Sequence, residues 1–155
     1  MFARDKPVTS PLTASLLAVL IWLGLWYPAP LFAQRDQPVV IVNPSVTLTT
    51  LSRNQLRAIF ALRLKVWPNG EAIRVHVFPP ESATHQRFCV RLLRIFPYQL
   101  QRVWDRLLYS GLGQAPHVVR DAREMEDSVA ALRGAIGYLG RLPKRRDVRV
   151  VEVRP

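Results

Sequence analysis

The order of apolar and polar positions predicts short strands that alternate with helices. Residues 39–42 form a continuous apolar run closed by Asn43-Pro44, which is typical of a strand buried on both faces. In residues 73–77, apolar side chains alternate with Arg74 and His76, which predicts a second strand. Three further short apolar runs predict the remaining strands, at residues 117–119, 135–138 and 148–151.

Helical periodicity fills the intervals between these strands. Ser52 and Gln55 form a capping box, which predicts a helix whose apolar stripe includes Ile59. Pro97 is expected to begin a further helix that carries Trp104. The other apolar positions of these two helices are Leu56, Phe60, Leu64, Leu100, Val103, Leu107 and Leu108.

Two more helices are expected to start at polar capping residues. Ser82 is predicted to cap one of them, and Asp121 to cap the other, which would end with Gly134 at its C-cap. The positions expected to face inward are Phe88, Cys89, Leu92, Leu93 and Phe96 on the first helix and Met125, Val129 and Leu132 on the second.

This alternation predicts an α/β fold with a mainly parallel sheet flanked by helices. Residues 34–155 are long enough for one domain with one core, but not for two. The sequence shows no internal repeat and no low-complexity segment.

The N-terminal segment has the pattern of a secretory signal peptide. Arg4 and Lys6 precede a stretch without charge, whose apolar centre at residues 14–27 would form a helix about 21 Å long, against a hydrocarbon core of about 30 Å. Prolines follow, and Ala33 supplies a small residue for cleavage. We therefore predict a signal peptide at residues 1–33 and a periplasmic or secreted domain at 34–155. An uncleaved membrane anchor is the alternative.

The charge of the chain limits its partners. The formal net charge is +11, and removal of residues 1–33 would lower it by only one. A basic surface attracts polyanions, but nucleic acid is a poor candidate for an exported protein. The favoured partners are therefore small anions, acidic proteins and anionic lipid. The alternative explanation is that the basic charge has no function and reflects the arginine usage of a GC-rich genome.

Cys89 is the only cysteine, so no internal disulfide can form. No Cys/His spacing indicates a metal or cofactor.

The candidate site is the junction between the strand at 73–77 and the following helix. Backbone N–H groups at a helix start favour an anion, and the hydroxyls of Ser82 and Thr84 can donate to phosphate oxygens. The alternative is an ordinary N-cap, in which Ser82 satisfies only the helix.

A series of motifs in this order resembles the substrate-binding proteins of phosphate ABC transporters, a branch of the type II periplasmic binding proteins. The motifs are Asn43-Pro44 after an apolar strand; residues 51–60, similar to "Ls-x-x-qL-x-x-IF"; residues 66–70, similar to "nWpdG"; residues 82–88, at the place of "SGT…F"; Trp104 with residues 108–111, similar to "W…ftG"; and residues 134–138, which match "GAIGY".

The resemblance implies an exported binding protein without catalytic activity, in phosphate uptake or sensing. It assigns Ser82, Ala83 and Thr84 to the anion site. Family members close two lobes around the ligand, whereas this chain has the length of one. We therefore expect phosphate or a similar anion to bind weakly, or two copies to pair as a homodimer.

Other residues give weaker indications. A stripe formed by Arg87, Arg91 and Arg94 could bind an acidic partner or be a solvated helix face. Cys89 is expected to be an inert core thiol, and His85 incidental. Nothing in the sequence resembles a nucleophile–base pair or a carboxylate dyad, so we expect no enzyme. Two alternatives to anion binding stay open: an interaction module for a protein of the cell envelope, and a basic protein associated with the inner membrane.

Overall fold

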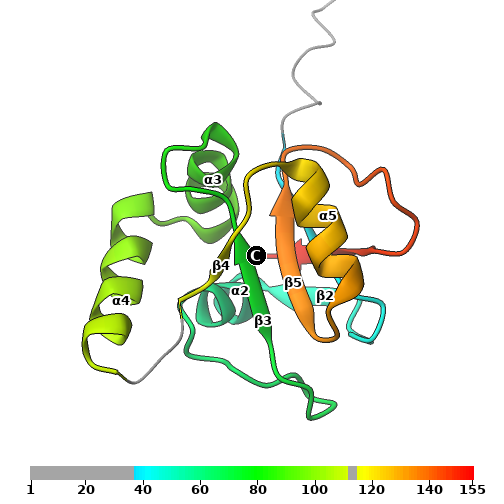
Figure 1. The fold of residues 1–155 in the computed structure, drawn as a ribbon, viewed down its shortest axis with the longest axis horizontal. Coiled ribbons are helices and arrows are strands. Elements are labelled where there is room, and N and C mark those ends of the chain that lie inside the picture. Colours follow the sequence, from blue (N-terminus) through cyan, green and yellow to red (C-terminus); the bar gives the residue numbers. More distant parts are fainter. Residues whose placement is uncertain (1–36, 112–114) are drawn as a thin grey trace, which may run out of the picture. The chain divides into compact units, whose positions relative to one another are not determined.

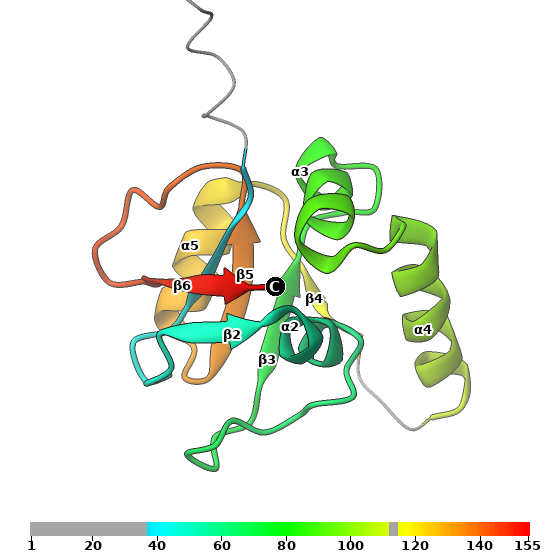
Figure 2. The same ribbon diagram turned by 180° about the vertical axis from the view of Figure 1, so that it is seen from behind.

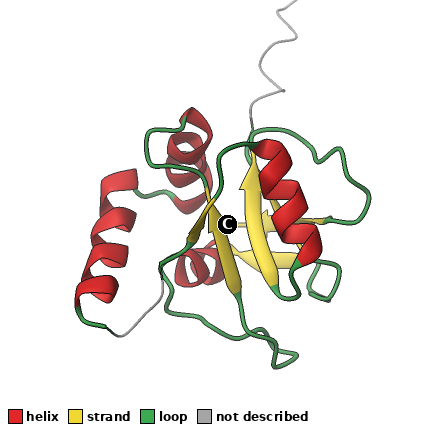
Figure 3. Cartoon of the chain, viewed as in Figure 1, coloured by secondary structure: helices red, strands yellow, loops and turns green. Residues whose placement is uncertain are grey.

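A computed structural model describes residues 37–111 and 115–155; the predicted signal peptide lies outside them. The elements of this part of the chain, shown in Figures 1 and 3, form one mixed sheet and the helices around it. They are β1 (Val39–Val42), β2 (Thr50–Ser52), α2 (Arg53–Phe60), β3 (Arg74–Val77), α3 (Ala83–Arg87), η2 (Phe88–Leu93), α4 (Pro97–Tyr109), β4 (His117–Val118), α5 (Ala122–Ala131), β5 (Ala135–Leu139) and β6 (Arg149–Arg154).

The six-stranded sheet has the order β2-β6-β1-β5-β3-β4. Three neighbouring pairs are parallel: β2 with β6, β3 with β5, and β3 with β4. The predicted α/β fold with a mainly parallel sheet flanked by helices is therefore confirmed. β1 departs from this direction, because it runs antiparallel to both β5 and β6. The short strand β2 was not predicted from the apolar pattern.

Helices cover both faces of β5, and all five residues of this strand are buried. Tyr138 stacks on Phe88 of η2 at 3.8 Å between ring centroids, and Phe60 of α2 meets both rings edge-on. On the opposite face, α5 approaches Gly137 so closely that a Cβ there would lie 2.4 Å from Met125 Sδ. Figures 1 and 2 show α5 and α2 on opposite faces of the sheet. The continuous apolar character of these strands follows from this two-sided cover.

The Trp67 turn is fixed by contacts far away in the sequence. The Trp67 indole N–H donates to the Gly134 carbonyl oxygen at 2.9 Å, and the Ser45 hydroxyl accepts from the Gly134 N–H at 3.0 Å. Gly134 has φ +70, and a Cβ there would lie 2.2 Å from the Ala72 carbonyl oxygen. The sequence-based prediction that Gly134 is the C-cap of α5 is thus wrong. Leu132 is the C-cap, and Gly134 allows the turn into β5.

The helix predicted to begin at Ser82 differs from expectation in its second half. After α3 the chain continues as the π-helical stretch η2, which ends at Arg94 in the left-handed conformation with φ 55. The helix therefore stops before Phe96, which is 59% exposed and stacks on Tyr98, so the expected inward position of Phe96 is wrong. Leu132 is also not inward. It is 39% exposed because α5 ends at Ala131.

Candidate functional site

The carboxyl ends of β3, β4 and β5 lie at one edge of the sheet, because these strands are parallel neighbours. Ligands of open α/β sheets commonly bind at such an edge. β3 leads through residues 78–82 into α3, β4 leads to Asp121 at the start of α5, and β5 ends beside Gly140. The structure therefore places the predicted site residues at an edge where small ligands bind in related architectures.

The three predicted site residues follow one another at the start of α3. Ser82 is the N-cap residue by position, and its side chain makes no capping hydrogen bond. Its backbone N–H donates to the Pro79 carbonyl oxygen at 2.9 Å. Ser82 and Thr84 are half-buried, and Ala83 is exposed. The sequence-based expectation that the Ser82 side chain caps the helix is thus wrong, because residues 79–82 form a turn closed by backbone atoms.

Gly140 brings the end of β5 against this helix start. A Cβ on Gly140 would lie 3.4 Å from Thr84 Oγ1 and 3.9 Å from a guanidinium nitrogen of Arg87. Thr84 and Arg87 are three residues apart on the helix and therefore share a face. A hydroxyl donor and a positive charge thus lie side by side next to a residue without a side chain. Sequence analysis did not select Gly140, although a glycine directly after a buried strand often marks a close approach of two segments.

One acidic residue opposes this positive charge. Glu81 is exposed, and its negative charge partly opposes the lowering of the His85 pKa that burial causes. It directly precedes Ser82, so it adds negative charge at the helix start. An anion bound there would be repelled by Glu81 and attracted by Arg87.

His85 belongs to a buried network behind the helix start. The Phe78 N–H donates to Tyr138 Oη at 3.1 Å, which leaves the Tyr138 O–H to donate a hydrogen bond to His85 Nδ1 at 2.6 Å. His85 then carries its proton on Nε2, which faces Cys89 Sγ at 3.4 Å. Burial lowers the pKa of His85, although Glu81 opposes this, and burial raises the pKa of the Cys89 thiol to about 12. The network therefore holds neutral groups and supports the helix start.

Glu126 holds the loop that follows β5. Its side chain is 3% exposed, and its Oε2 accepts hydrogen bonds from the backbone N–H groups of Lys144 and Arg145, both at 2.9 Å. Arg141 forms an ion pair with the other carboxylate oxygen at 2.9 Å. Sequence analysis missed this anchor, because an acidic residue within a helix is most often solvent-exposed.

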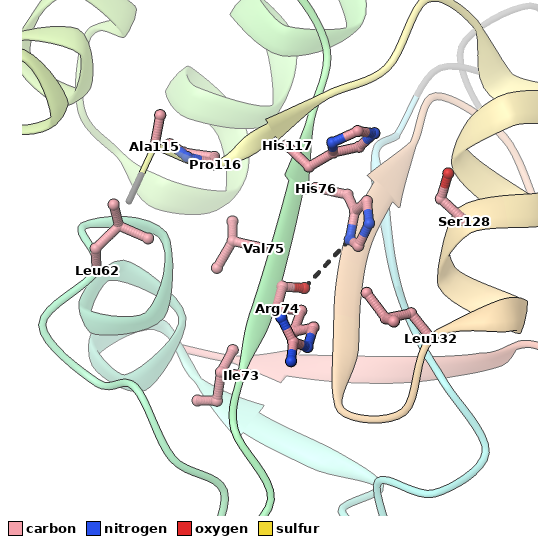
Figure 4. Close-up of a pocket in the computed structure, with 10 residues that line it drawn as sticks. All are labelled: Leu62, Ile73, Arg74, Val75, His76, Ala115, Pro116, His117, Ser128 and Leu132. Carbon is pink, nitrogen blue, oxygen red and sulfur yellow. Dashed lines mark hydrogen bonds between the residues drawn. The ribbon is translucent and has the colours of Figure 1, made fainter. Parts of the chain in front are cut away.

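A separate cavity of about 430 Å³ lies beside β3 and contains none of the predicted site residues. Its polar lining comes from Arg74, His76, His117 and Ser128, as Figure 4 shows. His76 and His117 are paired across β3 and β4, and their rings lie edge to face at 5.2 Å. His76 Nδ1 lies 3.2 Å from the Arg74 carbonyl oxygen, and burial lowers the pKa of His76.

Neither a metal cluster nor a membrane span occurs in the part of the chain that the structure describes. Among residues 37–111 and 115–155, no three His, Cys, Asp or Glu side chains are grouped so that they could hold an ion. In the same ranges, no helix has the length and apolar character needed to cross a bilayer.

Comparison with known proteins places this geometry in a structural context. No family model matches the sequence, and no curated protein matches it significantly. Solved structures do match: an ABC-type phosphate transport receptor from Vibrio cholerae (TM-score 0.60, 18% identity), PstS from Borrelia burgdorferi (0.56, 14%) and the phosphate-binding protein of Stenotrophomonas maltophilia (0.52, 16%). The chain shares their fold.

The match covers most of this chain but less than half of each neighbour. It includes 76–77% of this chain, against 46%, 47% and 39% of the three neighbours. The resemblance to phosphate transport binding proteins that the motifs indicated is therefore supported at the level of the fold. These neighbours are described as transport and binding proteins, and none of them as an enzyme.

Proposed function

We propose that this chain is an exported, non-catalytic binding module that takes phosphate or a similar small oxyanion at Ser82, Ala83 and Thr84. The observation that carries the proposal is the uncapped Ser82 hydroxyl at the carboxyl edge of three parallel strands. The side-chain oxygen of a serine at a helix start normally accepts a hydrogen bond from a backbone N–H of the first turn. Here that oxygen makes no capping bond, so its hydroxyl can serve a ligand.

The surroundings of Ser82 suit an anion of modest affinity. Thr84 offers a second hydroxyl, and Arg87 places a positive charge next to it and to Gly140. Hydrogen bonds to a charged group each contribute about 1.5–3 kcal/mol in a protected site, and much less where water competes. Because the chain spans less than half the length of its neighbours and Glu81 repels anions, we expect weak binding.

The proposal can be tested by calorimetric titration of phosphate into the purified protein, with sulfate as the competing anion. We expect saturable binding that Thr84→Val or Ser82→Ala weakens about tenfold, because each variant removes one hydrogen bond to a charged ligand. Glu81→Gln should strengthen binding, since it removes a repelling charge. Thr47→Val is the matched control, because Thr47 is an exposed loop residue.

Two outcomes would overturn the anion site. One is the absence of heat up to millimolar phosphate. The other is an equal loss of binding in Thr84→Val and Thr47→Val, which would indicate general attraction to a basic protein. Either result would favour the second candidate, an interaction module of the cell envelope that keeps the fold without the ligand. The exposure of Glu81 beside the helix start favours this second candidate.

A further inference from the structure

An apolar groove lies between α2 and α4, away from the residues of the proposed anion site. It consists of two adjoining hollows of about 450 and 640 Å³, which share Ala61, Arg63, Gln99 and Val103. Figure 2 shows α2 and α4 on the same side of the molecule. We refer to these two hollows together as the α2–α4 groove.

The floor of the α2–α4 groove is apolar. The residues that form it are Ala58, Ala61, Leu62, Ile95, Leu100, Val103 and Leu107. Of these, Leu100 is buried in the core, and the others remain partly accessible. Covering such a surface releases about 25 cal/mol for each Å² of apolar area removed from water. The groove therefore provides a driving force for a partner with apolar side chains.

The rim of the groove is uniformly basic. Its charged residues are Arg57, Arg63, Lys65, Arg102 and Arg106, and no acidic residue lines either hollow. Arg57 is held by the Leu93 and Arg94 carbonyl oxygens. The other four form no ion pair with any residue in the described ranges, although the Arg102 guanidinium lies 5.4 Å from the Tyr98 ring.

The groove is held in shape by contacts on either side. The Trp104 indole N–H donates to the Phe60 carbonyl oxygen at 2.8 Å and so ties α4 to the end of α2. Two residues after the end of α2, Leu62 has φ 58, a left-handed conformation that is strained for a residue other than glycine. A leucine at this position adds an apolar side chain to the floor at the expense of local backbone strain.

We propose that the α2–α4 groove binds an acidic protein segment that inserts apolar side chains between two helices. The apolar floor takes the anchors, and the basic rim pairs with acidic residues on either side of them. A second copy of this chain fits poorly, because its net charge is +11. A flat bilayer also fits poorly, since the apolar residues lie in a hollow between two helices.

The test is a selection from a random peptide display library on the purified full chain, followed by fluorescence anisotropy with the enriched peptides. We expect enrichment of peptides that combine Asp or Glu with Leu, Ile or Phe. The double variant Arg102→Glu with Arg106→Glu should weaken their binding at least tenfold. The matched control is Arg91→Glu with Arg146→Glu, which reverses two exposed charges elsewhere and should leave the affinity within about threefold.

The variant Leu62→Gly tests the contribution of the apolar floor without changing any charge. Glycine relieves the positive φ, so the variant should remain folded while the groove loses part of its floor. We expect weaker peptide binding and an unchanged response to phosphate, because Leu62 does not belong to the anion site.

Several results would overturn the proposal. They are the absence of enriched peptides, enrichment of peptides without acidic residues, and equal loss of binding in the two charge-reversed pairs. Binding to vesicles of anionic phospholipid without binding to any peptide would assign the groove to a membrane instead. Concentration-dependent dimerisation that Val103→Asp abolishes would assign it to a second copy.

Discussion

At the residue scale, His85 joins the core to the candidate anion site. It is 1% exposed, and it accepts a hydrogen bond from Tyr138 while its other ring nitrogen faces Cys89. The neutral imidazole suits this arrangement, because its Nδ1 accepts a hydrogen bond from the Tyr138 hydroxyl. The packing behind the candidate site, where Tyr138 and Cys89 contact His85, thus depends on a histidine that stays uncharged.

We predict that the stability of the folded protein falls as the pH is lowered from 7.5 to 5.5. Burial lowers the pKa of His85 and of His76 in the folded state, whereas the unfolded chain titrates near 6.5. The unfolded state therefore binds protons first, and the stability present above pH 6.5 is lost progressively below it. Thermal unfolding across this range should show a lower melting temperature at pH 5.5.

His85→Gln separates this effect from general acid sensitivity. Glutamine keeps a hydrogen-bond acceptor for Tyr138 but does not titrate, so the dependence on pH should be smaller than in the parent protein. An unchanged dependence in this variant would contradict a role for His85. The window stays above pH 5 so that carboxyl groups contribute little.

At the element scale, α4 is attached to the domain through one face. Leu100 and Trp104 are its buried residues, while Tyr98, Leu108 and Tyr109 are exposed. The Trp104 indole donates to Phe60 at the end of α2, so the same contact positions α4 and closes one side of the α2–α4 groove. The position of α4 therefore depends on two buried side chains, of which Trp104 also forms a hydrogen bond to α2.

Trp104→Phe should destabilise the domain by about 1–3 kcal/mol. It keeps a large apolar ring but leaves the buried Phe60 carbonyl oxygen without its donor. Tyr109→Ala, at a ring that is 92% exposed, should change the free energy of unfolding by less than about 0.5 kcal/mol. Urea denaturation of the three proteins measures both effects. Equal stability of the Trp104 variant and the parent would show that the anchor is not needed.

At the scale of the whole molecule, the described domain is a single folded unit with one continuous core. The mixed sheet runs from β2 to β4, and the helices on its two faces bury the strands between them. The fold matches phosphate transport binding proteins, but the match covers less than half of each of them. The candidate site therefore lies at an edge of a small domain and has Glu81 exposed beside it.

Export remains a prediction at this scale, and it can be measured directly. Mass spectrometry of protein recovered from the envelope of an expressing bacterium should give an N-terminus at Gln34, because the predicted signal peptide ends at the small residue Ala33. Ala33→Phe should block the cut and leave the intact chain. If the parent protein is instead recovered from membranes with its N-terminal segment still attached, the result would support the uncleaved anchor.

Sequence patterns predicted most of the elements because local rules decide them. The capping box at Ser52 and Gln55 forms as expected, with both of its hydrogen bonds. The apolar run at residues 39–42 is the strand β1, and Trp67 and Trp104 are buried in the core. The errors at Phe96 and Leu132 occur where a helix stops early, because a left-handed Arg94 or a turn held by Gly134 ends it.

The sequence alone determined the α/β class, the order of most of the elements and the residues at the start of α3, since periodicity and capping are local properties of the chain. Only the tertiary structure decided that β1 runs antiparallel to its neighbours and that the Ser82 hydroxyl makes no cap. It also brought Gly140, Thr84 and Arg87 together and opened the α2–α4 groove. The strand pairing, the contact of Gly140 with α3 and the groove join residues far apart in the chain, so they follow from packing rather than from local pattern.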